Sequence, residues 1–416
     1  MDTFCLQRMG KFRSTLLSFV TVCAILGVAI AVIAYGRGYR LDLQKNSLKP
    51  TGLVSATSDP TGAQVLVDGT LKTATNNSFS IDPGYYTIRI TKEGYIPWEK
   101  KIRVQGEVVS QASAFLFPTS PSLSPITNSG IANPTLSPNG SKVAYAHDGL
   151  WYYELSEGPL GRNRDPIQLD MNTDGFDFNT AQLTWSPDAT QLLVESTPAA
   201  RLYTIARPNT FTDVTLTRTS LLADWDAQKL DTEKQKLAAF KPEIINMATS
   251  SAKIISFSPD ETKILYEATA SATIPQVIVP PLIGTNSTPE DRNIVPGKLY
   301  VYDSKEDKNY FLLDLKELPT PTPTPKTKAV ATQPVTNTQE TSFPIHWFPT
   351  SRHLLLTLQG KIDVLEYDRT NWITIYSGPF VDDFVAPWSN GSRIIILTNL
   401  NGDAQSLPNL YTVNLR

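Results

Sequence analysis

The stretch LTWSPDATQLLV, residues 183–194, is the most informative part of this chain of 416 residues. It predicts a strand, a tight turn and a second strand. Pro187 presets the backbone angle φ inside the turn, and Asp188 is a residue type that bonds its own backbone there. The aromatic Trp185 lies at the end of the first strand. One such unit cannot bury its own apolar face, so the stretch predicts a structure built from several copies.

Related phrases occur four more times. They are TLSPNGSKVAY at 135–145, ISFSPDETKILY at 255–266, IHWFPTSRHLLL at 345–356 and APWSNGSRIII at 386–396. The fourth of the five copies is degenerate, and the last one lacks a proline after its serine. The anchor residues Ser137, Ser186, Ser258, Phe348 and Ser389 are 49, 72, 90 and 41 residues apart. Spacings of about 40–50 residues are typical of propeller blades, and the long gaps indicate inserts or an unrecognised blade.

A strand that carries aromatic side chains follows each copy. These strands are expected at 150–155, 201–205, 298–303, 362–367 and 409–414. The repeated phrase resembles the WD40-like repeat of TolB-type β-propellers, and the resemblance implies a β-propeller over residues 119–416. We expect five to seven blades. We also expect the last strand, near Arg416, to close the ring against residues close to 120–135.

Two inserts interrupt the repeats. Residues 219–243 are the strongest helical segment of this region, and we expect Asp224 to cap the helix and Pro242 to end it. A helix packed on a blade edge and a partner-binding protrusion are both open interpretations. Residues 316–342 contain PTPTPTP at 319–325 and then a polar stretch, which predicts an extended or disordered loop. That loop is either merely solvated or has a glycosylated or adhesive role.

Residues 51–118 alternate in the manner of strands separated by turns, with the last strand expected at residues 98–104. Four ordered motifs, PTGA at 60–63, VLVDG at 65–69, PGYYTI at 83–88 and KEGYIPW at 92–98, resemble those of the PEGA domain. Thr61 stands where the name-giving glutamate would be. The resemblance implies a small β-sandwich of an envelope protein that acts as a spacer or interaction module and performs no chemistry.

The N-terminal region predicts a membrane anchor. Residues 14–35 contain no charged side chain. A helix of this length spans roughly 33 Å, and the hydrocarbon core of a bilayer is about 30 Å thick. A cleaved signal peptide and a lipoprotein attached at Cys23 are the alternatives. The long apolar stretch and the poor cleavage sequence AYGRGYR at 34–40 favour an uncleaved signal anchor.

This prediction divides the N-terminal region further. We expect residues 1–13 to be a short cytoplasmic tail and residues 36–50 to be a juxtamembrane linker. Large domains that follow an anchor cross the membrane largely regardless of their charge. The bulk of the chain is therefore expected outside the cytoplasm.

Composition excludes several classes of protein. The chain has 37 Lys and Arg against 40 Asp and Glu, for a net charge of −3. Basic residues are concentrated before residue 50, so the rest is acidic, which argues against nucleic acid as a partner. Cys5 and Cys23 are the only cysteines. A disulfide framework, a zinc ribbon and a catalytic thiol are therefore excluded from residues 24–416.

Catalytic, cofactor and metal sites are not predicted. His346 and His353 lie on opposite sides of a predicted turn without metal-ligand spacing, and His147 lies in another turn. The sequence contains no nucleophile elbow, no P-loop and no dinucleotide fingerprint. Residues 170–177 are rich in aspartate but lack a calcium-loop pattern. Residues 171–180 are a candidate blade loop on a binding face, without an assigned residue.

The recurring aspartates Asp188 and Asp260 are explained as turn residues of the repeat. The sequence thus favours a mainly β, non-enzymatic, single-pass envelope protein without a cofactor. Its PEGA-like module would lift the propeller off the membrane, and the propeller would bind protein or glycan on one rim. The alternatives are a lyase or hydrolase whose acidic or histidine side chains converge in the central channel, and a sensor whose residues 1–13 contact a cytoplasmic partner.

Overall fold

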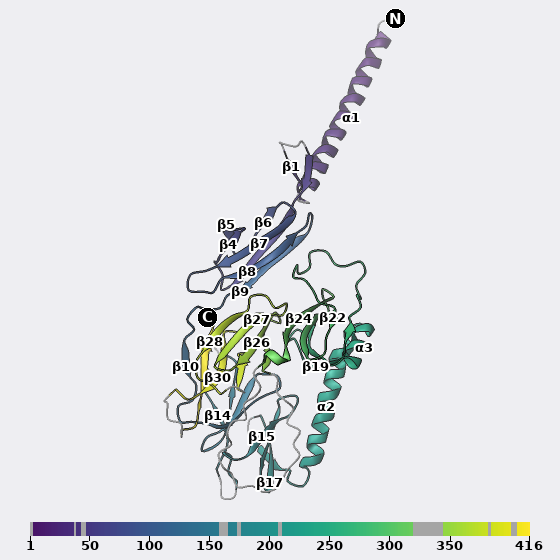
Figure 1. The fold of residues 1–416 in the computed structure, drawn as a ribbon. Coiled ribbons are helices and arrows are strands. Elements are labelled where there is room, and N and C mark those ends of the chain that lie inside the picture. Colours follow the sequence, from purple (N-terminus) through teal and green to yellow (C-terminus); the bar gives the residue numbers. More distant parts are fainter. Residues whose placement is uncertain are drawn as a thin grey trace. The chain divides into compact units, whose positions relative to one another are not determined.

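The computed structural model divides the chain into two compact units. It describes residues 3–36, 39–42, 47–157, 165–172, 176–206, 210–318, 344–381, 384–400 and 406–416 (Figure 1). The first unit consists of residues 1–93, 97–116 and 282–288, and the second of residues 94–96, 117–281 and 289–416. Most of the predicted loop at 316–342 lies outside the described residues, as do the side chains of the predicted tail at 1–13.

A long helix, α1 (Thr3–Gly36), begins the chain. Its side chains of Leu17, Ile25 and Ile30 are each more than 60% exposed. Among the residues that the structure describes, no helix combines the length and the apolar character that a membrane crossing requires. The helix expected over residues 14–35 is therefore confirmed, whereas its role as a membrane span is not.

The described residues of the first unit form two sheets beyond the short hairpin of β1 (Tyr39–Asp42) and β2 (Ser47–Pro50). The four-stranded sheet has the order β5 (Thr70–Ala74), β4 (Gln64–Val67), β7 (Gly84–Thr91) and β8 (Trp98–Val104). The three-stranded sheet has the order β6 (Asn77–Ile81), β3 (Gly52–Asp59) and β9 (Val109–Phe115). Buried and more exposed side chains alternate along β3 and β8, so each sheet buries one of its faces and leaves the other more exposed.

The expectation that β8 is the last strand of this region is wrong. β9 follows it and pairs with β3 in parallel, with Val109 opposite Leu53. The buried side chains of β9 include Ser110, Ala112 and Ala114, which are small. Such residues have weak strand propensity, so the sequence carries little signal for this strand.

The segment Leu282–Thr288 belongs to the first unit although it comes from far along the chain, between β21 (Ala272–Thr273) and β22 (Asn293–Ile294). The hydroxyl of Ser287 accepts a hydrogen bond of 2.8 Å from the backbone N–H of Arg103 in β8. Because β8 is an edge strand, this contact satisfies one of its otherwise unpaired groups.

The described part of the second unit contains five four-stranded antiparallel sheets, numbered here from first to fifth. The first consists of β11 (Ala132–Leu136), β12 (Lys142–Ala146), β13 (Gly149–Glu154) and β14 (Ile167–Met171). The second consists of β15 (Gln182–Trp185), β16 (Gln191–Ser196), β17 (Ala199–Thr204) and β18 (Thr210–Asp213). The third consists of β19 (Ala252–Phe257), β20 (Lys263–Ala268), β23 (Lys298–Asp303) and β24 (Lys308–Asp314), which a 3-10 turn, η2 (Leu315–Glu317), follows.

The fourth sheet consists of β25 (Ile345–Trp347), β26 (His353–Leu358), β27 (Lys361–Glu366) and β28 (Ile373–Ser377). The fifth has the order β10 (Leu123–Pro125), β31 (Asn409–Asn414), β30 (Arg393–Thr398) and β29 (Val385–Pro387). Its outer strand, β10, precedes all the others in the chain and pairs with the last one, Leu123 lying opposite Val413. The predicted closure against residues near 120–135 is confirmed.

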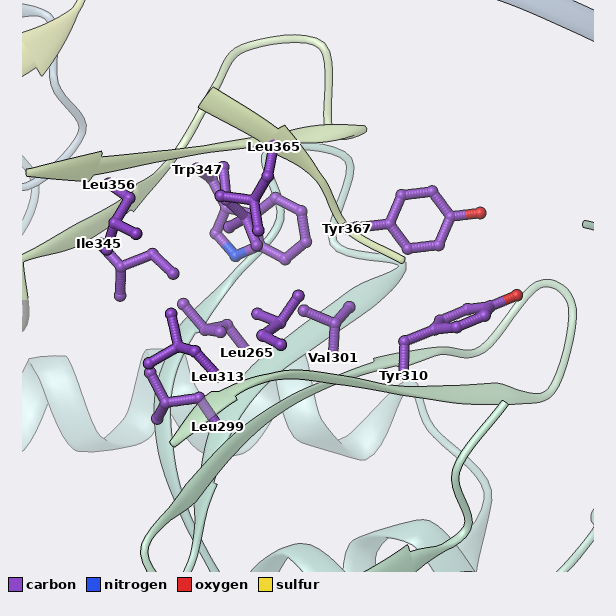
Figure 2. Packing of buried hydrophobic residues seen from close by; sticks show 12 residues of the cluster. Leu265, Leu299, Val301, Tyr310, Leu313, Ile345, Trp347, Leu356, Leu365 and Tyr367 are labelled. Carbon is purple, nitrogen blue, oxygen red and sulfur yellow. The ribbon is translucent and has the colours of Figure 1, made fainter. Parts of the chain in front are cut away.

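Apolar clusters join successive sheets. Figure 2 shows one of them, in which Leu265 and Val301 of the third sheet meet Trp347 and Leu365 of the fourth. Similar clusters join the first sheet to the second and the fifth sheet to the first. Antiparallel sheets that pack in succession and close on themselves have the architecture of a β-propeller. The chain is mainly β, as expected, and the blade number of five to seven stays a prediction.

Two helices lie between the second and third sheets (Figure 1). The helix α2 (Arg218–Ala238) packs Trp225 against Leu193 and Ala200 of the second sheet. Beyond its end, Phe240 joins Ile244 and Met247 of α3 (Pro242–Ser250) against the third sheet. The middle of α2, residues 226–235, is exposed on all sides. The helix therefore connects two sheets by packing at both of its ends, in agreement with packing on a blade edge.

The expected ends of this helix are partly wrong. It begins at Arg218, after Thr217, so Asp224 lies in its second turn and does not cap it. Pro242 follows the end of α2 as expected, but it also starts α3 as its first residue. Proline is favoured there because an N–H in the first turn of a helix has no acceptor within the helix, so the missing N–H of proline costs no hydrogen bond.

The five repeat turns share one backbone geometry. In each, the first residue donates its N–H to the carbonyl five positions later, and the fourth residue donates to the carbonyl of the first. The first residues are Ser137, Ser186, Ser258, Phe348 and Trp388. The anchor of the fifth copy is therefore Trp388 and not Ser389, as the sequence comparison had suggested. Its tryptophan occupies the serine position, and Ser389 occupies the proline position.

The fourth residue of each turn has a left-handed backbone. Its φ is 66° at Gly140, 57° at Ala189, 56° at Glu261, 57° at Ser351 and 69° at Gly391. Only glycine adopts this region without strain, and the other residue types are held there by the turn. A shared turn geometry with different residues shows that the repeat is enforced by the backbone hydrogen bonds and not by one residue type.

Side chains reinforce the three turns that keep serine in the first position. In the third sheet the hydroxyl of Ser258 donates to the carboxylate of Asp260 at 2.7 Å and accepts from the N–H of Lys263 at 2.9 Å. Partial burial acts to raise the pKa of the Asp260 carboxyl. The hydrogen bonds from Ser258 and Thr262 and the charge of Lys263 outweigh that effect and hold this pKa well below its usual value.

Two glycines at the same turn position provide a matched test of packing. A Cβ at Gly391 would come within 2.9 Å of the ring of Phe348, whereas a Cβ at Gly140 would meet no atom within 4 Å. We expect Gly140→Ala to cost about 1 kcal/mol from backbone strain. Gly391→Ala should cost about 2–4 kcal/mol, because overpacking adds to the strain. Urea unfolding of the full chain measures both, and equal losses would contradict the packing of the fourth and fifth turns.

Acid should remove the contribution of Asp260 to stability. Its folded-state pKa lies below the unfolded value of about 3.9, so the native state binds fewer protons there. The stabilisation is therefore complete above roughly pH 5 and falls as the pH drops below about 4. We expect the difference in unfolding free energy between the wild type and Asp260→Asn to be largest at neutral pH and to shrink in acid. The exposed Asp226→Asn is the control, and a pH-independent difference for Asp260→Asn would contradict this account.

Candidate functional site

A cavity of about 170 Å³ opens where the ring of sheets closes. Its lining residues are Ile126, Thr127, Asn128, Ser129, Gly130, Ile131, Tyr145, His147, Trp151 and Pro166. Residues 126–131 connect β10 of the fifth sheet to β11 of the first. Tyr145 lies on β12, Trp151 lies on β13, and His147 lies in the turn between them. The closing segment of the ring and one edge of the first sheet thus form the two sides of the cavity.

The cavity has an apolar floor and a polar rim. Tyr145 is 3% exposed and Ile131 is 2% exposed, and both belong to the cluster that joins the first and fifth sheets. Asn128 and Ser129 are exposed at the rim, and the hydroxyl of Ser129 donates to the amide oxygen of Asn128 at 3.0 Å. The floor therefore depends on the same packing that holds the ring together.

Asn409 fastens the segment 126–131 to the last strand. Its side-chain oxygen accepts from the N–H of Gly130 at 2.9 Å and from the hydroxyl of Thr127 at 3.1 Å. Backbone bonds add to this, because the carbonyl of Leu410 accepts from Ile126 at 2.8 Å and that of Pro408 accepts from Ile131 at 2.9 Å. This wall of the cavity is consequently built before any ligand arrives.

On the opposite side of the cavity, the indole of Trp151 is held in place and the phenol of Tyr145 is uncharged. The indole N–H of Trp151 donates to the carbonyl of His147 at 2.8 Å, which fixes the ring and uses its polar atom. Burial, with a smaller effect from the neighbouring Tyr153, raises the pKa of Tyr145 to about 12. The phenol therefore keeps its proton at neutral pH. The described residues that line the cavity include no aspartate, glutamate, lysine or arginine.

The three histidines do not meet. His147 lines the cavity, whereas His346 and His353 lie on neighbouring strands of the fourth sheet. His353 is buried, its Nδ1 lies 2.9 Å from the hydroxyl of Thr350, and its ring packs against Phe117 and Phe348. Within the described ranges, no group of three potential ligands is arranged to hold a metal ion.

The aspartate-rich stretch at 170–177 contributes contacts between the first and second sheets. The carboxylate of Asp170 accepts from the hydroxyl of Tyr203 at 2.6 Å and from the guanidinium of Arg201 at 3.3 Å. That guanidinium lies between the rings of Phe176 and Phe211, 4.2 and 4.7 Å from their centres. Asp170 is thus engaged in a structural contact. Part of the candidate binding loop at 171–180 lies outside the described residues, and its binding role stays a prediction.

Sequence reasoning placed His147 in a turn but did not identify the cavity. The residues Thr127-Asn128-Ser129-Gly130 have the composition of an ordinary turn and match no motif. Their partner Asn409 lies almost three hundred residues away in the sequence. The available signal is their position, within the segment at 120–135 against which the last strand is expected to close the ring.

Removing the side chain of Asn409 should loosen the cavity wall. Asn409→Ala leaves the buried N–H of Gly130 without its acceptor, which costs about 2 kcal/mol. We expect faster hydrogen exchange at Gly130 and a lower unfolding free energy. Asn409→Asp retains the acceptor oxygen and should lose less. Equal exchange rates at Gly130 in both variants would contradict the assigned role.

Comparisons with known proteins agree with part of the sequence analysis. No curated protein matches the chain. Similar solved structures include a putative TolB from Agrobacterium tumefaciens, with 12% identity over 67% of this chain and 76% of that one, at a TM-score of 0.20. They also include TolB from Acinetobacter baumannii, with 12% identity over 79% of this chain and 59% of that one, at a TM-score of 0.21. The family model of the PEGA domain matches residues 51–116, and this part of the chain is therefore a PEGA domain.

Proposed function

We propose that this chain is a non-enzymatic protein of the cell envelope whose propeller binds a protein or glycan partner. In this proposal α1 anchors the chain in a membrane, and everything after about residue 36 lies on the outer side. The uncharged stretch at 14–35 and the PEGA domain at 51–116 support this location. The PEGA domain acts as the spacer between the membrane and the propeller.

The observation that carries the binding role is the cavity at the ring closure. It combines an apolar floor, an indole ring held in place and polar groups at the rim, which are the features of a recognition site. The buried carboxylates elsewhere hold the fold together. Asp363, for example, accepts from Trp372 at 2.8 Å, from Thr374 at 2.7 Å and from Lys361 at 3.1 Å. These contacts favour recognition over catalysis as the purpose of the propeller.

Site-directed labelling tests the location. Because Cys5 and Cys23 are the only cysteines, their replacement by serine leaves a background without thiols. We expect Lys234→Cys, on the exposed middle of α2, to react with a membrane-impermeant maleimide on intact cells. Thr3→Cys, in the expected tail, should react only after the cells are permeabilised. The opposite pattern would overturn the orientation.

A truncation tests the anchor itself. The variant lacking residues 1–36 should be released from membranes by washing, whereas the full chain should stay with them. Retention of the truncated variant after a high-salt wash would show that α1 is not the anchor.

A further inference from the structure

We propose that the cavity at the ring closure binds a single uncharged sugar ring, such as one residue of an envelope glycan. The inference rests on the proposed function and deepens it by naming the ligand class and the residues that recognise it. Trp151, Tyr145 and Ile131 form the apolar part of the site, and Asn128, Ser129 and His147 form its polar part.

The size of the cavity limits the ligand to one ring. Its volume of about 170 Å³ is smaller than the roughly 300–1,000 Å³ of pockets for drug-sized molecules. Its mouth lies at the surface, where Asn128 and Ser129 are exposed. One unit of a longer polymer can therefore enter while the rest of the polymer stays in solvent.

The charges around the cavity favour a neutral ligand. Its described lining contains no acidic side chain and no lysine or arginine, although charged residues make up 19% of the chain. The phenol of Tyr145 is protonated at neutral pH because burial raises its pKa. A phosphate or carboxylate that entered would lose its water without meeting a lysine or arginine, which is costly.

The arrangement of polar and apolar groups distinguishes a sugar from an apolar side chain of a peptide. A sugar ring presents carbon-bound hydrogens on its face and hydroxyl groups around its edge. That pattern matches an apolar floor surrounded by Asn128, Ser129 and His147. An aliphatic or aromatic side chain would cover the same floor but form no hydrogen bonds with the polar groups of the rim, so it would gain less binding free energy from this site.

The site is organised before it binds. Asn409 holds Thr127 and Gly130 in place, and the bond from Trp151 to the carbonyl of His147 fixes the indole. A ligand therefore does not have to order this wall, and less of its binding free energy is lost to conformational entropy. Such preorganisation matters for a single sugar ring, because its small area provides little free energy.

Ligand-observed NMR with the full chain tests this inference. The probes are the methyl glycosides of glucose, galactose, mannose and N-acetylglucosamine, in a detergent without a sugar head group. Methyl glucuronide is the charged counterpart, and N-acetyltyrosine amide represents a peptide side chain. We expect saturation transfer to at least one neutral glycoside, and weaker transfer to the glucuronide and to the tyrosine amide.

Variants locate the binding. Trp151→Ala should weaken it about tenfold, and Asn128→Ala, on the exposed rim, should weaken it about threefold to tenfold. Trp372→Ala is the matched control, because this indole is 38% exposed on the fourth sheet and outside the cavity. It should leave sugar binding unchanged. If Trp151→Ala does not fold, the Asn128→Ala variant decides the question.

The outcomes separate this inference from the proposed function. Sedimentation of the full chain in detergent with delipidated cell envelopes, where α1 has no membrane to enter, tests the function independently. Binding to envelopes without transfer to any glycoside would overturn the sugar site and leave the function standing. Transfer to the tyrosine amide alone, lost in Trp151→Ala, would reassign the cavity to a peptide. Sugar binding that survives both cavity variants would also overturn the assignment.

Discussion

The second unit depends on the hydrogen bonds between β10 and β31. β31 follows the other strands of the fifth sheet in the chain, whereas β10 is far from them in the sequence, since Leu123 pairs with Val413 across almost the whole unit. Chain entropy opposes such a closure, but the cost grows only slowly with the length of the loop. Closure offsets this cost because the fifth sheet then packs its apolar side chains against the first. The cluster around Tyr145 and Trp388 is formed only in the closed ring.

The features that sequence reasoning predicted are those with local causes. The repeat turns were found because proline and a side-chain acceptor, as in Pro259-Asp260, act on their own backbone. The Asp68-Gly69 hairpin was found for the same reason, since both residues adopt positive φ. Where the local signal is weak, the prediction fails. β9 was missed because its buried residues are small, and the fifth turn was misplaced by one position because Trp388 replaces serine.

The features that were missed depend on contacts between distant parts of the chain. The sequence of α2 clearly predicts a helix, yet only the folded unit reveals that its ends pack on two different sheets. The cavity is a stronger case. Its wall at 126–131 is an ordinary turn in sequence, and it becomes a rigid surface only because Asn409 accepts bonds from Thr127 and Gly130. The residue types of these three positions do not by themselves indicate that they pair.

The position of the cavity links recognition to the integrity of the ring. One wall belongs to the segment that Asn409 and Leu410 hold on the fifth sheet, and the other belongs to β12 and β13 of the first. A molecule that touches both walls contacts the two sheets that meet at the closure. Because a ligand that binds only the folded state adds its binding free energy to stability, an occupant of this cavity would strengthen the seam on which the unit depends. The contact between the first and fifth sheets would thus both close the ring and form the recognition surface.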